Sequence, residues 1–354
     1  MATKKTTTDG FKLMKSDIKN GEIKSVYIFH GEEKYLLEHY LDQIKTKLVN
    51  PDMEQFNYTL FDGKDLKFEL LLDAVESLPM FSDRKLVVVR DYDIFRSAES
   101  SLKDFEKLIE DLPETTCLIF VYDVLEYKPK TNTKLYKAII RIGRVVEFPV
   151  QNDSELVSWL KRNFRALKKD IDPSDAMYML HICGKHMYKL KLEVAKVAAY
   201  AKGDKILRSD IDAVCIPVLD AVIYNMTDAV VEQRFSDAIV IMRDLIQMKN
   251  DPTPILAALG KQLRRLYYTQ KAINNGNPEN FVRNELEIRY PFLITKTIGA
   301  AKKLSTKWCA EALKLCAEWD YKMKTSGGDR EELLELLLLN LSNLRYLESG
   351  VSRQ

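Results

Sequence analysis

The sequence has little glycine, few cysteines and no long apolar run. Glycine accounts for 13 of 354 residues, about half of the usual share of about 7%, which favours a helix-rich fold with few tight turns. No apolar run approaches the ~18–20 residues of a membrane-spanning helix, so we expect no membrane partner. Residues 1–10 are rich in Thr and Lys. We therefore expect neither a signal peptide nor an ordered element there.

The five cysteines show no pattern of a disulfide or metal site. Their number is odd, and no two of them have C-x-x-C spacing. This argues against a disulfide framework and against a zinc ribbon. His181 and His186 are five positions apart, whereas a helical zinc pair needs four. We expect buried free thiols in a reducing cytoplasm, with Cys309 and Cys316 in a helical core, and no metal.

Length and charge limit the class of protein further. A chain of 354 residues predicts two or three domains at ~100–200 residues each. Lys and Arg number 54 against 52 Asp and Glu, a net charge of +2. This near-neutral balance argues against a general binder of polyanions.

The first part of the chain alternates between short apolar runs and helical periodicity. The predicted strands are Ser25–His30, Phe56–Phe61, Lys85–Arg90, Thr116–Tyr122 and Arg144–Phe148. The predicted helices between them are Glu33–Lys47, Leu66–Ser77, Ser101–Asp111 and Thr133–Arg141. Strands that alternate with helices of this length imply a parallel sheet in an α/β layer structure.

Strand signals stop at Pro149, and the rest of the sequence is helical in pattern. The predicted larger helices are 219–230, 233–248, 253–275, 291–302, 306–324 and 329–347. We expect a tail and leading helix over 1–20, an α/β domain over 21–149, a small helical domain over 150–214 and a larger one over 215–354. Leucines lie on nearly every side of the last helix, which predicts burial on more than one face. The order of the parts is similar to that of AAA+ ATPases, an analogy of architecture alone.

The sequence lacks the phosphate cradle of an ATPase. After the first predicted strand it has Gly31 followed by Glu32 and Glu33, without the second glycine and the Lys-Ser or Lys-Thr pair of that motif. The two glutamates would repel phosphate. Asp91 follows the third strand in an Arg-Asp-Tyr context, without the acidic pair that supports magnesium chemistry. We therefore expect no nucleotide hydrolysis, no catalytic residues and no cofactor.

Five segments together resemble a known family, the delta subunits of bacterial DNA polymerase III. The segments are Tyr27–Glu38, Leu71–Asp91, Leu112–Asp123, Leu192–Ala201 and Asp320–Leu339. The resemblance implies the clamp-binding member of a clamp loader, with an AAA+-like fold and no working ATP site. It also implies a helical collar shared with the ATP-binding gamma/tau subunits and delta-prime, contact with primed DNA, and a place in a cytoplasmic nucleotidyltransferase holoenzyme. ATP would act in the other subunits, which would expose or hide the clamp-binding surface.

The resemblance assigns Met80 and Phe81, with Leu78 beside them, to a plug that enters a pocket on the ring-shaped sliding clamp (beta). The family often has Leu-Phe here, and Met is a flexible apolar substitute. Leu78 continues a helical spacing, so we expect it to face the core, and Pro79 then ends the helix. Met80 and Phe81 fall outside the helical frame, on a predicted loop tip. The alternative is that both side chains fold back onto the edge of the sheet.

A basic stripe is a candidate contact with DNA. Lys261, Arg264 and Arg265 lie at positions i, i+3 and i+4 of a predicted helix, with Tyr267 and Tyr268 behind them. Such a stripe would meet phosphates, and the alternative is a solvated outer face. The turn at 326–328 is a second candidate by analogy with the family. Three other functions stay open: a working ATPase of the same fold, a nucleic-acid-binding adaptor without a clamp, and a scaffold that acts through the last helix.

Overall fold

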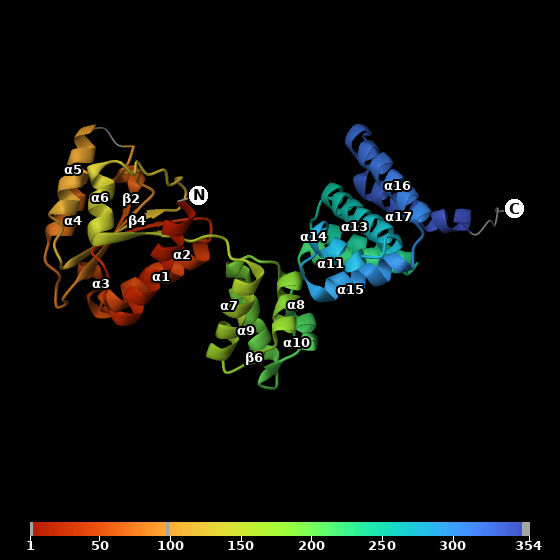
Figure 1. The fold of residues 1–354 in the computed structure, drawn as a ribbon, viewed down its shortest axis with the longest axis horizontal. Helices are drawn as coiled ribbons and strands as arrows, with labels where there is room; N and C mark the ends of the chain where they lie inside the picture. The colour runs from red at the N-terminus through yellow and green to blue at the C-terminus, as the bar shows by residue number, and fades with distance from the viewer. Residues whose placement is uncertain (1–2, 97–98, 349–354) are drawn as a thin grey trace. The chain divides into compact units, whose positions relative to one another are not determined.

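The chain forms two compact units, residues 1–152 and residues 153–354 (Figure 1). The computed structural model describes residues 3–96 and 99–348. Among the described helices, none alone has the length and apolar composition to cross a membrane. One bent pair, Arg208–Val214 with Leu219–Val231, meets these two criteria only when taken together.

The first unit is built on a five-stranded sheet. Its strands are β1 (Val26–His30), β2 (Tyr58–Asp62), β3 (Lys85–Arg90), β4 (Thr116–Tyr122) and β5 (Gly143–Glu147). Their order is β2-β3-β4-β1-β5, and every neighbouring pair is parallel. The central strands are buried along almost their whole length, because helices cover both faces of the sheet. The predicted α/β sheet is confirmed.

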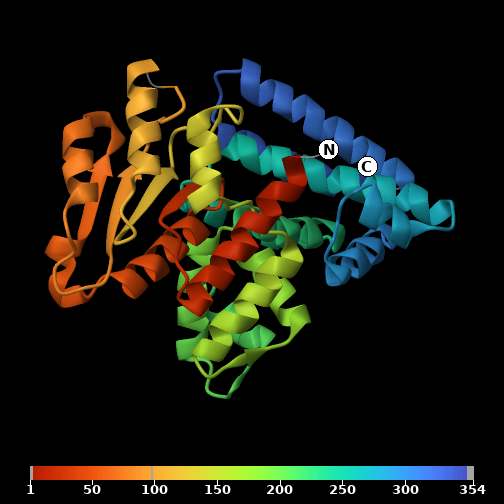
Figure 2. The same ribbon diagram turned by 60° about the vertical axis from the view of Figure 1, so that its left-hand side comes forward.

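Helices lie on both sides of this sheet, as Figures 1 and 2 show. One face packs against α4 (Phe68–Glu76), α5 (Glu99–Glu110) and α6 (Lys134–Ile142). On the other side lie α1 (Thr3–Asn20) and α2 (Lys34–Leu48). Three short elements, η1 (Pro51–Met53), α3 (Glu54–Asn57) and η2 (Gly63–Asp65), flank β2. The prediction that β2 begins at Phe56 is wrong, because α3 includes this residue.

The N-terminal segment is ordered in a helix, so the expectation of no ordered element in residues 1–10 is wrong from Thr3 onward. Helix α1 packs on the edge strand β5. At Gly10 the two backbones approach so closely that a Cβ atom would lie 2.2 Å from the Val145 carbonyl oxygen. The buried Asp17 carboxylate accepts hydrogen bonds of 2.5 and 3.1 Å from Arg144 on β5. These tertiary contacts stabilise the leading helix expected within residues 1–20, which begins earlier than the sequence predicts.

The second unit is almost entirely helical. It begins with α7 (Asp153–Ala166), α8 (Pro173–Cys183), α9 (Met187–Tyr200) and α10 (Arg208–Val214). Two strands of two residues each, β6 (Asp170–Ile171) and β7 (Lys205–Ile206), pair in parallel among these helices. The expectation that strands end at Pro149 is wrong for this pair, because two residues are too few to give a periodic signal. Helix α10 begins at Arg208, with Leu207 as its N-cap.

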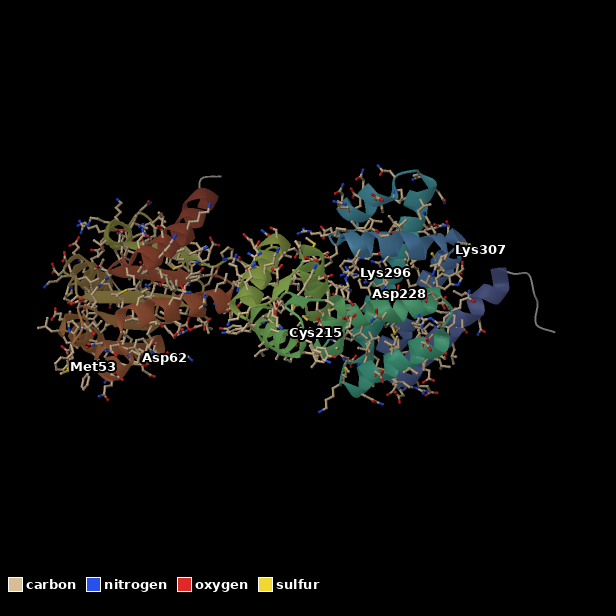
Figure 3. The ribbon with its side chains drawn as sticks, turned by 90° about the horizontal axis from the view of Figure 1, so that it is seen from below. Met53, Asp62, Cys215, Asp228, Lys296 and Lys307 are labelled. Carbon is tan, nitrogen blue, oxygen red and sulfur yellow. The ribbon has the colours of Figure 1, made fainter. Side chains whose placement is uncertain are left out.

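The remaining helices confirm most of the predicted segments. They are α11 (Leu219–Val231), α12 (Phe235–Gln247), α13 (Pro252–Asn274), α14 (Pro278–Asn284), α15 (Pro291–Lys302), α16 (Thr306–Thr325) and α17 (Arg330–Glu348). Only α14, with seven residues, has no counterpart among the predictions. An ion pair between Asp228 and Lys296 links α11 to α15 (Figure 3), and burial raises the pKa of Asp228.

Two further predictions, on the cysteines and on the last helix, have different outcomes. All five cysteines are free and buried, as expected. Helix α17 buries one face through leucines three, four and seven positions apart, Leu334, Leu337, Leu338 and Leu341. Leu336 and Leu339 lie exposed on the same helix, so this chain alone buries one face of α17, and burial of a second face against other subunits stays a prediction. The His181 ring contacts Tyr224 and Phe292, so α8 packs directly on the larger helical part. The domain boundary at 214/215 stays a prediction.

Candidate functional site

The loop between α4 and β3, residues 77–84, exposes three large apolar side chains; we call it the plug loop. The exposed fractions are 79% for Leu78, 43% for Met80 and 83% for Phe81. Phe81 is therefore not folded back onto the sheet edge. Neighbouring exposed apolar side chains on one loop are typical of a protein–protein contact.

Leu78 does not face the core, and this prediction is wrong. Helix α4 already ends at Glu76, and Ser77 has an extended conformation with ψ of 146°. Leu78 therefore lies beyond the helix and off the buried face that contains Leu71 and Val75. Because a residue before proline disfavours the helical conformation, Pro79 reinforces this early end. All three predicted plug residues thus share the loop surface.

Buried polar contacts hold both ends of the plug loop. The Lys85 ammonium group donates to the carbonyl and to the hydroxyl oxygen of Ser77, the latter at 2.7 Å. Burial lowers the pKa of Lys85 to about 8. The Arg84 guanidinium donates to the Ile23 carbonyl at 2.5 Å and to the Thr116 carbonyl at 3.4 Å. The sequence analysis did not identify Lys85 as an anchor of the loop. The one signal for this role was the position of a lysine at the start of a buried strand.

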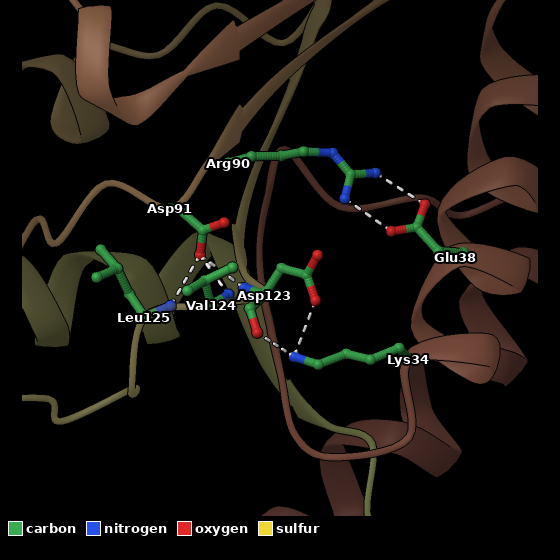
Figure 4. A network of polar contacts seen from close by, with 7 residues as sticks. All are labelled: Lys34, Glu38, Arg90, Asp91, Asp123, Val124 and Leu125. Atoms are coloured by element: carbon green, nitrogen blue, oxygen red, sulfur yellow. Dashed lines mark hydrogen bonds and ion pairs between the residues drawn. The ribbon is translucent and has the colours of Figure 1, made fainter. Parts of the chain in front are cut away.

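The plug loop lies at the amino-terminal edge of the parallel sheet, since it leads into β3. In open α/β sheets, ligands bind at the opposite, carboxyl-terminal edge. At that edge the Lys34 ammonium pairs with the Asp123 carboxylate at 3.0 Å (Figure 4). Arg90 donates two hydrogen bonds of 2.7 Å to Glu38, and these bonds raise the pKa of Arg90. Lys34 and Arg90 are thus each paired with a carboxylate of the chain itself. They lie at the edge where a nucleotide phosphate would need a cation.

The loop after β4 closes over the same edge. The Asp91 carboxylate accepts hydrogen bonds from the backbone N–H groups of three successive residues, Asp123, Val124 and Leu125, at 2.9, 2.7 and 3.0 Å (Figure 4). Gly31, at the end of β1, packs on backbone, because a Cβ there would lie 2.4 Å from the Phe148 carbonyl oxygen. Its role is therefore explained by close packing. The absence of nucleotide hydrolysis stays a prediction.

The structure separates the three residues of the predicted basic stripe on α13. Lys261 and Arg264 are exposed. Arg265 is half-buried and donates a hydrogen bond of 2.9 Å to the Tyr224 hydroxyl oxygen. Two of the three residues are thus available on the surface for a phosphate. The turn at 326–328 is exposed between α16 and α17.

The fold also brings together three buried groups that their spacing in the sequence does not connect. In the described part of the chain, the potential ligand atoms of Cys183, Glu193 and Cys215 lie within 4.8 Å of one another. The Glu193 carboxylate is 2.7 Å from the Lys196 ammonium group, which neutralises its charge. A hydrogen bond with Cys183 and burial raise the pKa of the Cys215 thiol far above its usual value. The Cys215 thiol is thus held in its neutral form, and the Glu193 carboxylate is already paired within the chain.

Comparisons with known proteins agree with this architecture. The family model "DNA polymerase III, delta subunit" matches residues 27–148, and the model of the C-terminal domain of that subunit matches residues 220–341. DNA polymerase III subunit delta of Bacillus subtilis (strain 168) is 24% identical over 338 residues, which cover 94% of this chain and 96% of the relative. A probable subunit delta of Aquifex aeolicus (strain VF5) is 24% identical over 293 residues, 81% of this chain and 82% of the relative.

A solved structure shows the same fold. The Bacillus subtilis DNA clamp loader delta protein superposes with a TM-score of 0.56 at 22% identity, over 93% of this chain and 98% of that chain. The fold and these matches define a subunit of DNA polymerase III with an α/β domain followed by helices. Within that class, the chain belongs to the DNA polymerase III delta subunit family.

Proposed function

We propose that this delta subunit binds the ring-shaped sliding clamp through Leu78, Met80 and Phe81 and helps to open the ring for loading onto primed DNA. The observation that carries the proposal is the plug loop itself, which exposes Leu78 and Phe81 by about four fifths. The family relationship supports the choice of the clamp as the partner.

The plug is large enough to dominate a small interface. Full burial of an exposed Met or Phe side chain contributes about 1.5–3 kcal/mol. Because Phe81 is 83% and Met80 43% exposed before binding, the two together supply about 2–4 kcal/mol. A few central apolar residues commonly provide most of the binding free energy of an interface. Ring opening then follows from tighter binding to the open clamp than to the closed clamp, because a ligand shifts an equilibrium only by its differential affinity.

The helical unit is proposed to join a collar with the ATP-binding gamma/tau subunits and delta-prime. Two observations support this assignment: the match to the C-terminal family model and the exposed Leu336 and Leu339 on α17. Lys261 and Arg264 on α13 are proposed to contact phosphates of the primed DNA inside the assembled loader. ATP hydrolysis is assigned to the partner subunits.

A clamp-binding assay with paired variants tests the plug. The Met80→Ala/Phe81→Ala variant and the wild-type chain are compared for binding to the sliding clamp of the same cell and for clamp loading. We expect at least about thirtyfold weaker binding, which corresponds to the lower limit of the burial estimate, about 2 kcal/mol. Val124→Ala is the matched control, because Val124 is 86% exposed and lies at the opposite edge of the sheet. Binding within about twofold of wild type in the double variant rejects the plug.

Two inexpensive measurements separate the alternatives. Saturable binding of labelled ATP to the purified chain would favour an active ATPase, whereas the pairing of Lys34 and Arg90 with carboxylates opposes it. Tight DNA binding without a clamp would favour a nucleic-acid adaptor, whereas the net charge of +2 opposes it.

A further inference from the structure

A buried asparagine outside the plug loop holds the middle of that loop. Asn57 is the last residue of α3, directly before β2, and it is 1% exposed. Its Oδ1 atom accepts a hydrogen bond of 2.8 Å from the Met80 N–H group, and its Nδ2 atom donates one of 2.7 Å to the Met80 carbonyl oxygen. One side-chain amide thus satisfies both backbone groups of Met80, as a neighbouring strand would.

We infer that Asn57 is a positioning residue for clamp binding, which holds the plug loop in its outward conformation so that the free chain presents the plug without a trigger. This inference rests on the proposed function of Met80 and Phe81. It adds a residue that touches no clamp and acts through the backbone of Met80.

The outward conformation needs such an anchor because it is unfavourable by itself. Leu78 and Phe81 expose most of their apolar surface to water. Phe81 also has a φ of +51°, in the left-handed region that non-glycine residues rarely adopt. A loop free to relax would turn these side chains toward the sheet edge and would leave the left-handed region.

Among the described residues, Asn57 provides the only side-chain hydrogen bonds to the middle of the plug loop. Ser77 is fixed by Lys85, and Arg84 is fixed by its bonds to carbonyl oxygens, so both ends of the loop are held. Between these ends, the two hydrogen bonds of Asn57 hold Met80, next to Phe81. Without these two bonds, the segment from Leu78 to Asp83 is held only at its two ends, and Met80 is no longer fixed.

The chemistry at position 57 calls for an amide. An Asn side chain offers a donor and an acceptor in one plane, which match the N–H and C=O groups of a peptide. Asn57→Asp keeps an acceptor for the Met80 N–H group but places a second carboxylate oxygen against the Met80 carbonyl. Asn57→Ala removes both bonds and leaves two backbone groups without their partner.

The expected consequence is weaker clamp binding through a smaller competent population. When only a fraction f of the chains is competent to bind, the apparent Kd rises by 1/f. A fall of f from nearly one to about a tenth makes binding about tenfold weaker. We therefore expect about tenfold weaker binding for Asn57→Ala and an intermediate or equal loss for Asn57→Asp.

The test compares clamp affinity in two backgrounds. The Kd for surface-immobilised clamp is measured for Asn57→Ala in the wild-type chain and in the Phe81→Ala chain. Urea unfolding gives the stability of each variant. If Asn57 acts by positioning the plug, its roughly tenfold effect falls below about threefold once the Phe81 ring is absent. Asn163→Ala is the control. Asn163 lies in the other unit, and its side-chain amide also donates a hydrogen bond to a backbone carbonyl oxygen, that of Trp159, at 2.9 Å. We expect it to lower stability without changing the Kd.

The outcomes separate this inference from the proposed function. If Met80→Ala/Phe81→Ala loses binding while Asn57→Ala binds like wild type, the role of Asn57 is rejected and the plug is kept. An equal loss from Asn57→Ala in both backgrounds also rejects positioning. If the double variant binds like wild type, the proposed function fails, and this inference fails with it.

A measurement on the wild-type chain decides the matter if the variants do not fold. The Met80 amide hydrogen lies in an exposed loop but is bonded to a buried acceptor. We expect its hydrogen exchange to be slowed at least about tenfold relative to an unstructured peptide, since exchange requires the bond to open. Exchange at the unprotected rate shows that the anchor is not maintained in solution and overturns the inference.

Discussion

The Lys34 ammonium group and the Asp123 carboxylate lie 3.0 Å apart, and Lys34 also donates to the Asp123 carbonyl oxygen. The pair joins the segment after β1 to the end of β4 at the edge where α/β proteins usually bind phosphates. The lysine that follows the first strand of this fold therefore forms its ion pair within the chain. The neighbouring Arg90 likewise pairs with Glu38.

We expect no saturable binding of labelled ATP in the presence of magnesium, for the wild-type chain or for Asp123→Ala. Removal of Asp123 releases Lys34 but does not create the glycine-rich cradle, and Glu32 and Glu33 still repel phosphate. The variant should lose at most about 1 kcal/mol of stability, because the pair is partly exposed. Equilibrium binding with an ATP-binding subunit as the positive control checks this. Micromolar affinity in the wild-type chain would contradict it.

The left-handed residues Phe81 and Asp91 should respond oppositely to glycine. Phe81 has a φ of +51° and an exposed ring, so Phe81→Gly relieves strain and raises the free energy of unfolding by up to about 1 kcal/mol, while clamp binding becomes weaker. Asp91 has a φ of +52°, yet its carboxylate accepts three backbone N–H groups. Asp91→Gly should therefore lower stability by about 1–3 kcal/mol.

Urea unfolding at neutral pH measures both glycine variants, and clamp affinity is measured in parallel. Asp91→Asn is the control, since it keeps an acceptor oxygen and should retain most of the stability. A clear loss of stability in Phe81→Gly would mean that the ring packs on the protein, contrary to its exposure.

Acid should destabilise the first unit through His30. Burial, reinforced by the charge of Lys34, lowers the pKa of His30 from 6.5 to about 4. The imidazole stacks on the Tyr127 ring, with 4.2 Å between the ring centroids. Between pH 6.5 and about 4, the unfolded chain binds a proton at this position and the folded chain does not, so stability falls as pH falls. Over this pH range the free energy of unfolding falls by at most about 3 kcal/mol through His30.

His30→Phe keeps the ring stack and removes this proton uptake, so its free energy of unfolding should decline less steeply between pH 6.5 and 4. His181 in the second unit also has a pKa lowered to about 4 by burial, so a double variant with His181→Phe should be flatter still. Urea titrations at several pH values measure these slopes. An unchanged slope in His30→Phe would show that this histidine does not carry the acid sensitivity.

The sheet was predictable because its buried strands have strong local signals. Lys85–Arg90 and Thr116–Tyr122 are continuous apolar runs between helical segments, and the structure places β3 and β4 at these bounds. The weaker signal of β2, an edge strand with exposed positions, gave a start two residues too early. Local patterns thus fixed the elements wherever burial is nearly complete.

The site was less predictable because its parts interact over long separations in the sequence. Asn57 and Met80 are 23 positions apart, and no local pattern connects a residue before one strand to the loop before another. Helix α1 likewise depends on Gly10 and Asp17 meeting β5. The spacing of Leu78 fits a helix and predicts a place in the core, whereas the helix ends two residues before it. Such features depend on tertiary partners that a single sequence does not reveal.

On α13, the structure separates a DNA-contact candidate from a structural arginine. Lys261 and Arg264 are exposed, whereas Arg265 is bonded to Tyr224. If the first two meet phosphates, Lys261→Ala/Arg264→Ala in the assembled clamp loader should reduce the slope of log affinity against log salt by about two, since each duplex phosphate contact contributes about 0.9. Arg265→Ala should leave the slope unchanged and lower stability by about 1 kcal/mol, because the Tyr224 hydroxyl loses a partner. Fluorescence anisotropy with primed DNA over about 50–200 mM salt measures the slopes. The same slope in the double variant and the wild type would assign Lys261 and Arg264 to a solvated face, and DNA contact would then have to come from another surface or another subunit.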